Sequence, residues 1–264
     1  GKGVAYMVKN PEHFRDKKPA GTDVQEYFAE AKRWALEVMD SHIHGLVKPY
    51  NRVFLDLAQD KYNSSGVLES IWEAEEAGNR TTVEQASGRL GNTLGFGSSN
   101  DYSSNETYKN LAGMLNPGYS YKFAYGSVKL YEMYESEGDT SRGDWNIANY
   151  EYIFATTTDK EVKGRKYYFG KLRPGSVESK DSTFIQETAS VSNRNKTRCA
   201  AKYRREYETV NPKNKNYTPI NFPILRYSDI LLMIAEADNE LTAVPSDLAY
   251  ACLDSVRVRA GITP

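Results

Sequence analysis

The chain has 264 residues, enough to bury a sizeable core as one large domain or two small ones. Its 34 lysines and arginines are balanced by 35 aspartates and glutamates, so nothing in the charge indicates nucleic acid or an anionic membrane surface as a partner. No stretch approaches the ~18 consecutive apolar residues of a membrane-spanning helix.

Tyrosine and cysteine usage add two constraints. Twenty tyrosines suit core packing, and they also suit stacking on sugars, where a flat apolar face with a hydroxyl is useful. The two cysteines, Cys199 and Cys252, do not make a disulfide framework. A bridge between them is an alternative that the sequence disfavours, because Cys252 falls on an apolar helix face as a small buried hydrophobe.

The first part of the chain predicts two helices. Residues 4–8 have the character of a helix end, which Pro11 closes. In the next helix Thr22 and Gln25 form a capping box. Apolar residues then keep helical spacing, so we expect them, Tyr27 and Trp34 included, in the core: Val24, Tyr27, Phe28, Ala31, Trp34, Ala35, Val38 and Met39.

A histidine pair, His42 and His44, follows this helix. Such pairs occur in metal sites, but no cysteine, third histidine or acidic cluster adjoins this one. The C-terminal end of a helix favours cations and explains the pair better. We therefore predict no metal site.

The middle of the chain changes character several times. A short helix is expected at residues 52–58, and residues 68–75 are the best strand candidate. Residues 78–120 are rich in Gly, Ser, Asn and Thr, with interspersed aromatics and no periodicity. A loop this long is functional or disordered, and the aromatics argue against plain disorder. A helix is then predicted at residues 121–135.

The region after this helix is less regular. Residues 145–154, 167–169 and 199–207 are short aromatic-rich pieces that no pattern assigns to helix or strand. Residues 171–198 and 210–218 are interpreted as polar loops.

The chain ends in a predicted helical hairpin. Pro223 forces Phe222 into an extended conformation, and a helix follows from Tyr227 on helical spacing. Its apolar face is so wide that we expect cover on most sides. Ser246 is the expected N-cap of a second helix, and Gly261 lies where a left-handed C-cap belongs.

Arg226 stands at the start of the first helix of this hairpin, where the macrodipole disfavours a cation. We expect an ion pair with a nearby carboxylate, and the candidates are Asp229, Glu236 and Asp254.

No catalytic motif is present. The sequence has no nucleophile elbow, H-E-x-x-H motif, phosphate loop or dinucleotide fingerprint. Carboxylate pairs such as Glu73 and Glu75 exist, but glycoside hydrolysis needs two carboxylates about 5–9 Å apart across a cleft, which proximity in sequence does not supply. We expect no enzymatic activity and no cofactor.

Residues 222–241 (FPILRYSDILLMIAEADNEL) and 253–261 (LDSVRVRAG) closely resemble the C-terminal hallmark of the SusD/RagB family. Its members are surface-exposed outer-membrane lipoproteins of Bacteroidetes that bind nutrients, usually glycans, for a TonB-dependent transporter. Residues 69–73 resemble a short strand of the family. The turn with Asp139 and Arg142 resembles its Asp-x-Arg element, in which the acid and the base are expected to pair, with one extra residue between them here.

The resemblance implies a mainly α fold: tetratricopeptide-like helical hairpins with a loop-rich, aromatic-rich irregular region and minor short β-strands. We expect a single domain over residues 1–264, with a helical repeat part (1–66), a loop-rich ligand-binding part (67–220) and a C-terminal helical hairpin (221–264). Members carry a signal peptide and a lipid-acceptor cysteine, and residues 1–3 are neither. The chain is therefore expected to lack the N-terminal repeats.

The loop region offers what a neutral sugar needs, namely aromatic faces for its C–H groups and polar groups for its hydroxyls. Family members often bind glycan through such loops. The candidate ligand-binding residues are Phe96, Tyr102, Tyr108, Tyr119, Asn79, Arg80, Asn100 and Asp101.

The implied function is non-enzymatic binding of oligosaccharide or polysaccharide at the cell surface, for delivery to a SusC-like TonB-dependent transporter. The membrane contact would be an N-terminal lipid anchor absent from this chain. Two alternatives stay open: a peptide-binding member of the same family, and a helical-repeat scaffold that binds only protein.

Overall fold

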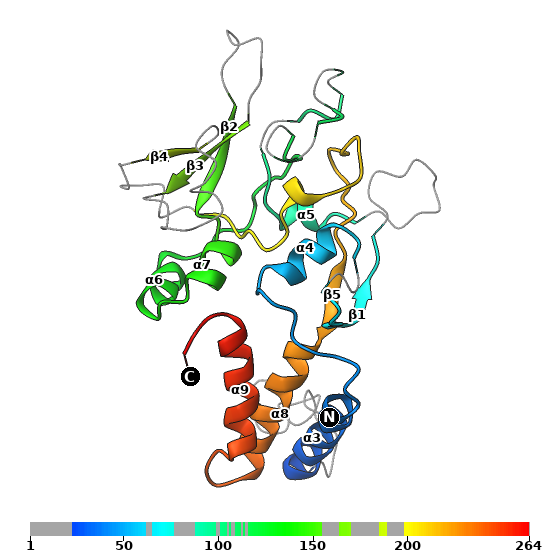
Figure 1. Cartoon of the computed structure of the whole chain (residues 1–264), viewed down its shortest axis with the longest axis vertical. Helices are drawn as coiled ribbons and strands as arrows, with labels where there is room; N and C mark the ends of the chain where they lie inside the picture. The colour runs from blue at the N-terminus through cyan, green and yellow to red at the C-terminus, as the bar shows by residue number, and fades with distance from the viewer. Residues whose placement is uncertain are drawn as a thin grey trace. The chain divides into compact units, whose positions relative to one another are not determined.

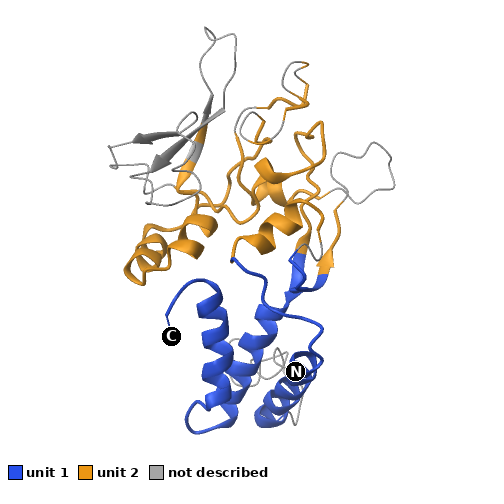
Figure 2. Ribbon diagram, in the orientation of Figure 1, with its two compact units in different colours: residues 1–49, 65–72, 223–264 blue, residues 50–64, 73–222 orange. Residues whose placement is uncertain are grey.

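The computed structural model describes residues 23–61, 65–76, 88–98, 101–104, 106, 109–111, 113, 116–154, 164–169, 185–188 and 198–263. The chain forms two compact units (Figure 2): unit 1 from residues 1–49, 65–72 and 223–264, and unit 2 from residues 50–64 and 73–222. The single domain with three consecutive parts expected from the sequence stays a prediction. The helix end expected at residues 4–8 lies outside the described residues.

Unit 1 is built from α3 (Val24–Asp40), α8 (Tyr227–Leu241) and α9 (Asp247–Arg259), shown in Figure 1. Helices α8 and α9 form the predicted hairpin, and α3 packs against α8. Their apolar faces meet in a buried cluster of six residues: Ala35, Ile230, Leu231, Ile234, Cys252 and Val256. Each large apolar side chain buried in this way contributes roughly 1.5–3 kcal/mol.

Helix α3 departs from the prediction at two positions. Asp23, and not Thr22, takes the N-cap position, where its carboxylate accepts a hydrogen bond of 2.9 Å from the amide of Gln25. Trp34, predicted in the core, is 54% exposed, and the Arg33 guanidinium lies 4.0 Å from its ring centroid. One residue is a rotation of about 100° in a helix, so Trp34 points away from the buried face that carries Ala35.

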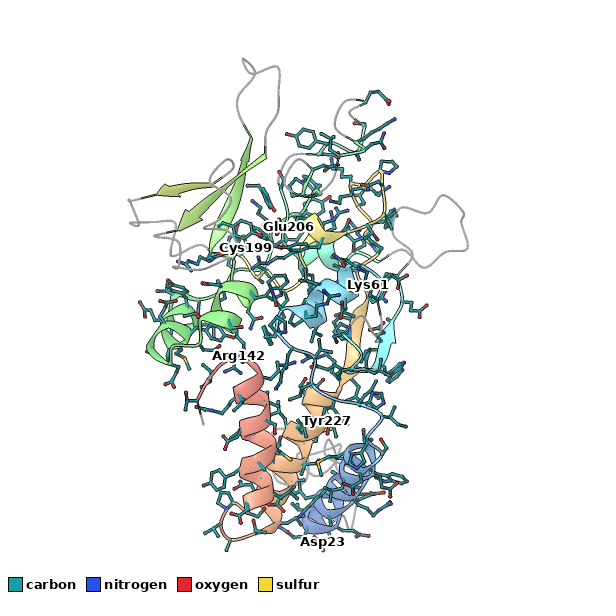
Figure 3. All side chains as sticks on the ribbon, viewed as in Figure 1. Asp23, Lys61, Arg142, Cys199, Glu206 and Tyr227 are labelled. Carbon is teal, nitrogen blue, oxygen red and sulfur yellow. The ribbon has the colours of Figure 1, made fainter. Side chains whose placement is uncertain are left out.

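The entry to the C-terminal hairpin agrees with the sequence. Strand β5 (Phe222–Arg226) pairs with β1 (Ser70–Ala74) in a two-stranded ribbon, and α8 begins at Tyr227, labelled in Figure 3. Ser246 caps α9, and Gly261 follows its end with φ of 87°. Leu232, however, is 38% exposed, so α8 is covered less completely than expected.

A buried carboxylate, Glu69, joins the chain segments of unit 1. It lies 2.8 Å from Nη1 of Arg259 at the end of α9, and it accepts a hydrogen bond of 2.8 Å from the amide of Val47. Arg226 Nη1 lies 3.5 Å from Glu69 and its Nε 3.6 Å from Asp229. Asp229 is therefore confirmed as a partner of Arg226, whereas Glu69 was not among the candidates.

Unit 2 combines short helices, irregular segments and a small sheet. Its helices are α4 (Arg52–Ala58), α5 (Leu90–Thr93), α6 (Val128–Ser136), α7 (Thr140–Asn146) and the 3₁₀ turn η4 (Arg205–Tyr207). Strand β2 (Tyr150–Phe154) pairs antiparallel with β3 (Gly164–Phe169), which pairs parallel with β4 (Ile185–Thr188). A buried cluster beside the sheet consists of Phe96, Ala148, Tyr150, Tyr152, Cys199 and Ala201.

Some predictions for unit 2 are wrong and others are confirmed. Helix α6 begins at Val128 and not at residue 121, because Ser127 is its N-cap. Strand β4 lies inside a segment predicted as a polar loop. The helix at 52–58 is α4, as predicted. Asp139 and Arg142 form the expected ion pair, and Asp139 also caps α7.

The chain is therefore mainly helical with short strands, which confirms the predicted fold class. Cys199 and Cys252 are both buried thiols that are not joined in a disulfide. Among the described residues, every helix is too short or too polar to cross a bilayer.

Candidate functional site

The candidate site begins with four aromatic side chains of unit 2, Tyr119, Tyr121, Phe123 and Tyr125, which we call the aromatic row. Phe123 and Tyr125 are 65% and 60% exposed. The rings of Tyr121 and Phe123 stack with centroids 4.9 Å apart and 6° between their planes, and Tyr119 meets Tyr121 edge-on at 5.1 Å. Phe123 therefore turns one face to Tyr121 and leaves the other open to a ligand.

Backbone hydrogen bonds fix the start of the row. The amide of Ser120 donates to the carbonyl of Ser98 at 2.8 Å, and the amide of Tyr121 donates to the carbonyl of Asn92 in α5 at 2.9 Å. The fully buried Asn92 also donates from its side chain to the carbonyl of Lys215 at 2.7 Å. The rings thus stand on a backbone whose polar groups are paired with neighbouring segments.

The buried Arg205 is the main support beneath the row. Its guanidinium forms a bidentate pair with Glu208, at 2.7 and 3.0 Å. Its remaining donors bind backbone carbonyls of two distant segments: Tyr119, Asn214, Lys215 and Tyr217. Because an arginine holds its donors in a rigid planar fork, this side chain fixes residue 119 against residues 214–217.

A charged pair, Asp101 and Lys215, lies at the Tyr119 end of the row. Lys215 Nζ is 3.4 Å from the Asp101 carboxylate and 5.1 Å from the centroid of the Tyr119 ring. The other oxygen of Asp101 accepts hydrogen bonds from the amide and the hydroxyl of Ser103, at 3.0 and 2.7 Å. Partial burial alone would raise the pKa of Asp101, but the bonds from Ser103 and the charge of Lys215 outweigh it, so its pKa lies below the ordinary value.

A second ionisable group, Glu206, lies in the interior of unit 2 (Figure 3). Burial raises its pKa to about 7, although hydrogen bonding from Tyr150 and the charge of Lys213 oppose the shift. Arg204 Nη1 donates to the hydroxyl of Tyr150 at 3.1 Å. These side chains are buried, so we interpret this cluster as part of the core.

The predicted site residues fall into three groups. Tyr119 and Asp101 belong to the row and its charged end, and Tyr102 is half-buried next to Asp101 in sequence. Phe96 is 1% exposed, with its ring 5.1 Å from that of Tyr150, so its predicted role as a stacking surface is corrected to core packing. The rest lie outside the described residues: Asn79, Arg80, Asn100 and Tyr108.

Sequence reasoning missed Tyr121, Phe123 and Tyr125 because it placed them in a helix. A signal was present, since aromatics at every second position are typical of an extended chain with one exposed side. Exposure indeed alternates from residue 121 to residue 127.

The described residues hold no group of three or more His, Cys, Asp or Glu side chains that could bind a metal ion. His44 of the predicted pair has its Nδ1 3.3 Å from the carbonyl oxygen of Leu68.

Comparison with solved structures shows the fold. A SusD homolog from Bacteroides thetaiotaomicron VPI-5482 is 20% identical with a TM-score of 0.60, covering 97% of this chain and 43% of that chain. Surface glycan-binding protein A from Bacteroides fluxus is 21% identical with a TM-score of 0.53, covering 91% and 42%. The same-named protein from Bacteroides thetaiotaomicron, solved in complex with laminarihexaose, is 17% identical with a TM-score of 0.50, covering 91% and 44%.

This chain thus spans less than half the length of these structures. A comparison with curated proteins found no match. A sequence model of the SusD family matches residues 68–264, which is more than half of the chain. The chain therefore belongs to the SusD family.

Proposed function

We propose that the protein binds oligosaccharide at the cell surface, without enzymatic turnover, and delivers it to a TonB-dependent outer-membrane transporter. The observation that carries the proposal is the aromatic row, with exposed rings on a fixed backbone next to a charged pair. Tyr119 and Asp101, and Tyr102 beside them, remain in the proposed site.

The chemistry of the row suits a sugar. A pyranose ring has an apolar C–H face that packs on an aromatic ring, and its rim of hydroxyls needs donors and acceptors. The open face of Phe123 supplies the first, and the Asp101–Lys215 pair supplies the second. Such a shallow site forms few fully desolvated contacts, so we expect weak affinity.

Two relatives support a glycan as ligand. The protein from Bacteroides fluxus is named a surface glycan-binding protein, and the Bacteroides thetaiotaomicron protein was solved in complex with laminarihexaose. Membership in the SusD family supports the transporter partner and a lipid-anchored place on the outer membrane.

Calorimetry with full-length protein and a panel of neutral oligosaccharides that includes laminarihexaose tests the proposal. Phe123→Ala and Tyr125→Ala should each weaken binding by about 2- to 10-fold, since each removes an open aromatic face. Tyr250→Ala is the matched control, because Tyr250 is similarly exposed on α9 of unit 1. No products should accumulate on prolonged incubation.

Two results would redirect the proposal. Binding of peptides, with none to any oligosaccharide, would favour the peptide-binding alternative. Unchanged binding in both row variants would remove the aromatic row from the site.

A further inference from the structure

The Asp101–Lys215 pair has a geometry that leaves room for a ligand. The separation of 3.4 Å between Lys215 Nζ and Asp101 Oδ2 is longer than the 2.7–2.9 Å of an optimal charge-assisted hydrogen bond. The side chains are 44% and 25% exposed. Each group therefore keeps bonding capacity toward solvent, as an acceptor on Asp101 and a donor on Lys215.

Both partners are positioned by other residues. Ser103 holds Oδ1 of Asp101 with two hydrogen bonds, which leaves Oδ2 directed at Lys215. The backbone of Lys215 is held through its carbonyl, which accepts from the side chains of Asn92 and Arg205. A pair with a fixed carboxylate and a fixed backbone loses less conformational entropy when a ligand binds.

Adjacent hydroxyls of a sugar match this arrangement. One hydroxyl can donate to the carboxylate of Asp101 while its neighbour accepts from the ammonium of Lys215. The ring of Tyr119 lies next to Lys215 and contacts the ring of Tyr121, so a sugar bound to the pair is close to the aromatic row. We propose that Asp101 and Lys215 bind two neighbouring hydroxyls of one sugar unit and select neutral glycans over glycans that carry carboxylate or sulfate groups. This inference rests on the proposed function and names the substrate class of that site.

Charge decides between neutral and anionic ligands. Asp101 is ionised, so it compensates Lys215 and repels an incoming anion. The lysine within the row, Lys122, has its Nζ 5.8 Å from the ring centroid of the buried Phe96, which places this ammonium toward the core. An anionic ligand at this end of the row would therefore find no net positive charge on the Asp101–Lys215 pair.

The test uses full-length protein, laminarihexaose as the neutral probe and a galacturonic acid hexamer as the anionic probe. Asp101→Asn and Lys215→Met each remove one charged partner, and the backbone carbonyl of residue 215 remains in place. Each should weaken laminarihexaose binding by roughly tenfold. Glu106→Gln is the control, because Glu106 pairs with Lys109 on the exposed surface of the same loop.

The preference of the unmodified protein separates the two readings. If it binds the galacturonic acid hexamer as tightly as laminarihexaose or more tightly, the site takes anionic glycans and the inference is wrong. If the Asp101 and Lys215 variants bind laminarihexaose like the unmodified protein while Phe123→Ala weakens it, the inference fails and the proposed site stands. Absence of binding to these two probes and to every oligosaccharide of the neutral panel would contradict both the inference and the proposed function. Urea midpoints equal to that of the unmodified protein should accompany the expected losses.

Discussion

The interior of each unit is stabilised by a different kind of contact. Unit 1 has three helices whose apolar faces pack in buried clusters, with a few buried charges: Glu69, Asp238 and Arg259. Unit 2 buries many more charged side chains among its described residues: Asp56, Asp139, Arg198, Arg204, Arg205, Glu206, Glu208 and Lys213. A periodic apolar pattern thus organises one unit, and side chains that bind backbone carbonyls organise the other.

The difference follows from the backbone of each unit. A helix pairs its own amides and carbonyls, so its side chains are free to pack. An irregular segment leaves carbonyls to be satisfied, and a buried cation with several donors can satisfy many at once. Arg204 is a second example, since it donates to the carbonyls of Ala201, Asp144 and Trp145. The fixed backbone beneath the candidate site therefore depends on buried charge.

The largest expected effect comes from Arg205→Met. This variant leaves Glu208 buried without its bidentate partner and removes a donor from the carbonyls of residues 119, 214, 215 and 217, which should cost about 3–5 kcal/mol. Urea unfolding monitored by hydrogen exchange should show the loss in unit 2, with amides near residue 120 losing protection first.

The same experiment tests whether the units are independent. Amides in α8 and α9 should keep their protection in Arg205→Met. An equal loss in both units would show that they unfold as one, and the distinction between their contacts would then have no energetic meaning.

Ile234→Ala addresses the other side of the comparison. Ile234 is fully buried in the cluster of unit 1, so its truncation should lower the free energy of unfolding of that unit by about 3 kcal/mol. Leu232→Ala is the matched control on the same helix, because Leu232 is partly exposed, and it should cost under about 1 kcal/mol. Equal losses in the two variants would contradict the apolar-face account.

Glu206 makes the stability of unit 2 depend on pH. Its pKa of about 7 in the folded protein exceeds the ordinary 4.5, so the folded state binds the proton more tightly. Its stabilising contribution is complete below pH 4.5 and is lost as the pH rises through 7. Glu206→Gln should remove this dependence, which amounts to roughly 2 kcal/mol between pH 5 and 7.5.

Urea unfolding of both proteins at several pH values measures the effect as the change in their difference. The series ends at pH 7.5, below the pKa of about 8 to which burial lowers Lys213. A difference that stays constant across the series would mean that Glu206 is ionised in the folded protein throughout.

The same contrast explains what the sequence could predict. The C-terminal hairpin was predictable because apolar spacing, Pro223, Ser246 and Gly261 are all local signals. Arg205 gives no such signal, since it binds the carbonyl of Tyr119 across 86 positions of sequence and any residue type can supply a carbonyl. Of the candidate site, the loop region with Tyr119 and Asp101 was therefore proposed from the sequence, and its supporting residues were not.

The aromatic row shows a second reason for failure. Residues 121–127 precede a real helix, and helix-forming residues after Ser127 drew the predicted start too far toward the N-terminus. The prediction that Trp34 lies in the core was wrong for another reason, because a wide apolar pattern does not tell which of two neighbouring residues faces the core.

The smallest effect is expected at the cap of α9. The hydroxyl of Ser246 accepts a hydrogen bond of 3.3 Å from the amide of Ala249 and donates to the buried carboxylate of Asp238. Ser246→Ala should therefore destabilise unit 1 by about 1–2 kcal/mol, more than a cap alone, because Asp238 also loses a donor. Ser246→Thr keeps the hydroxyl and should recover most of the loss, whereas Ser255→Ala, at an exposed position of the same helix, should change little. If Ser246→Thr is as unstable as Ser246→Ala, the hydroxyl does not stabilise this turn. Side-chain packing between α8 and α9 would then be what stabilises it.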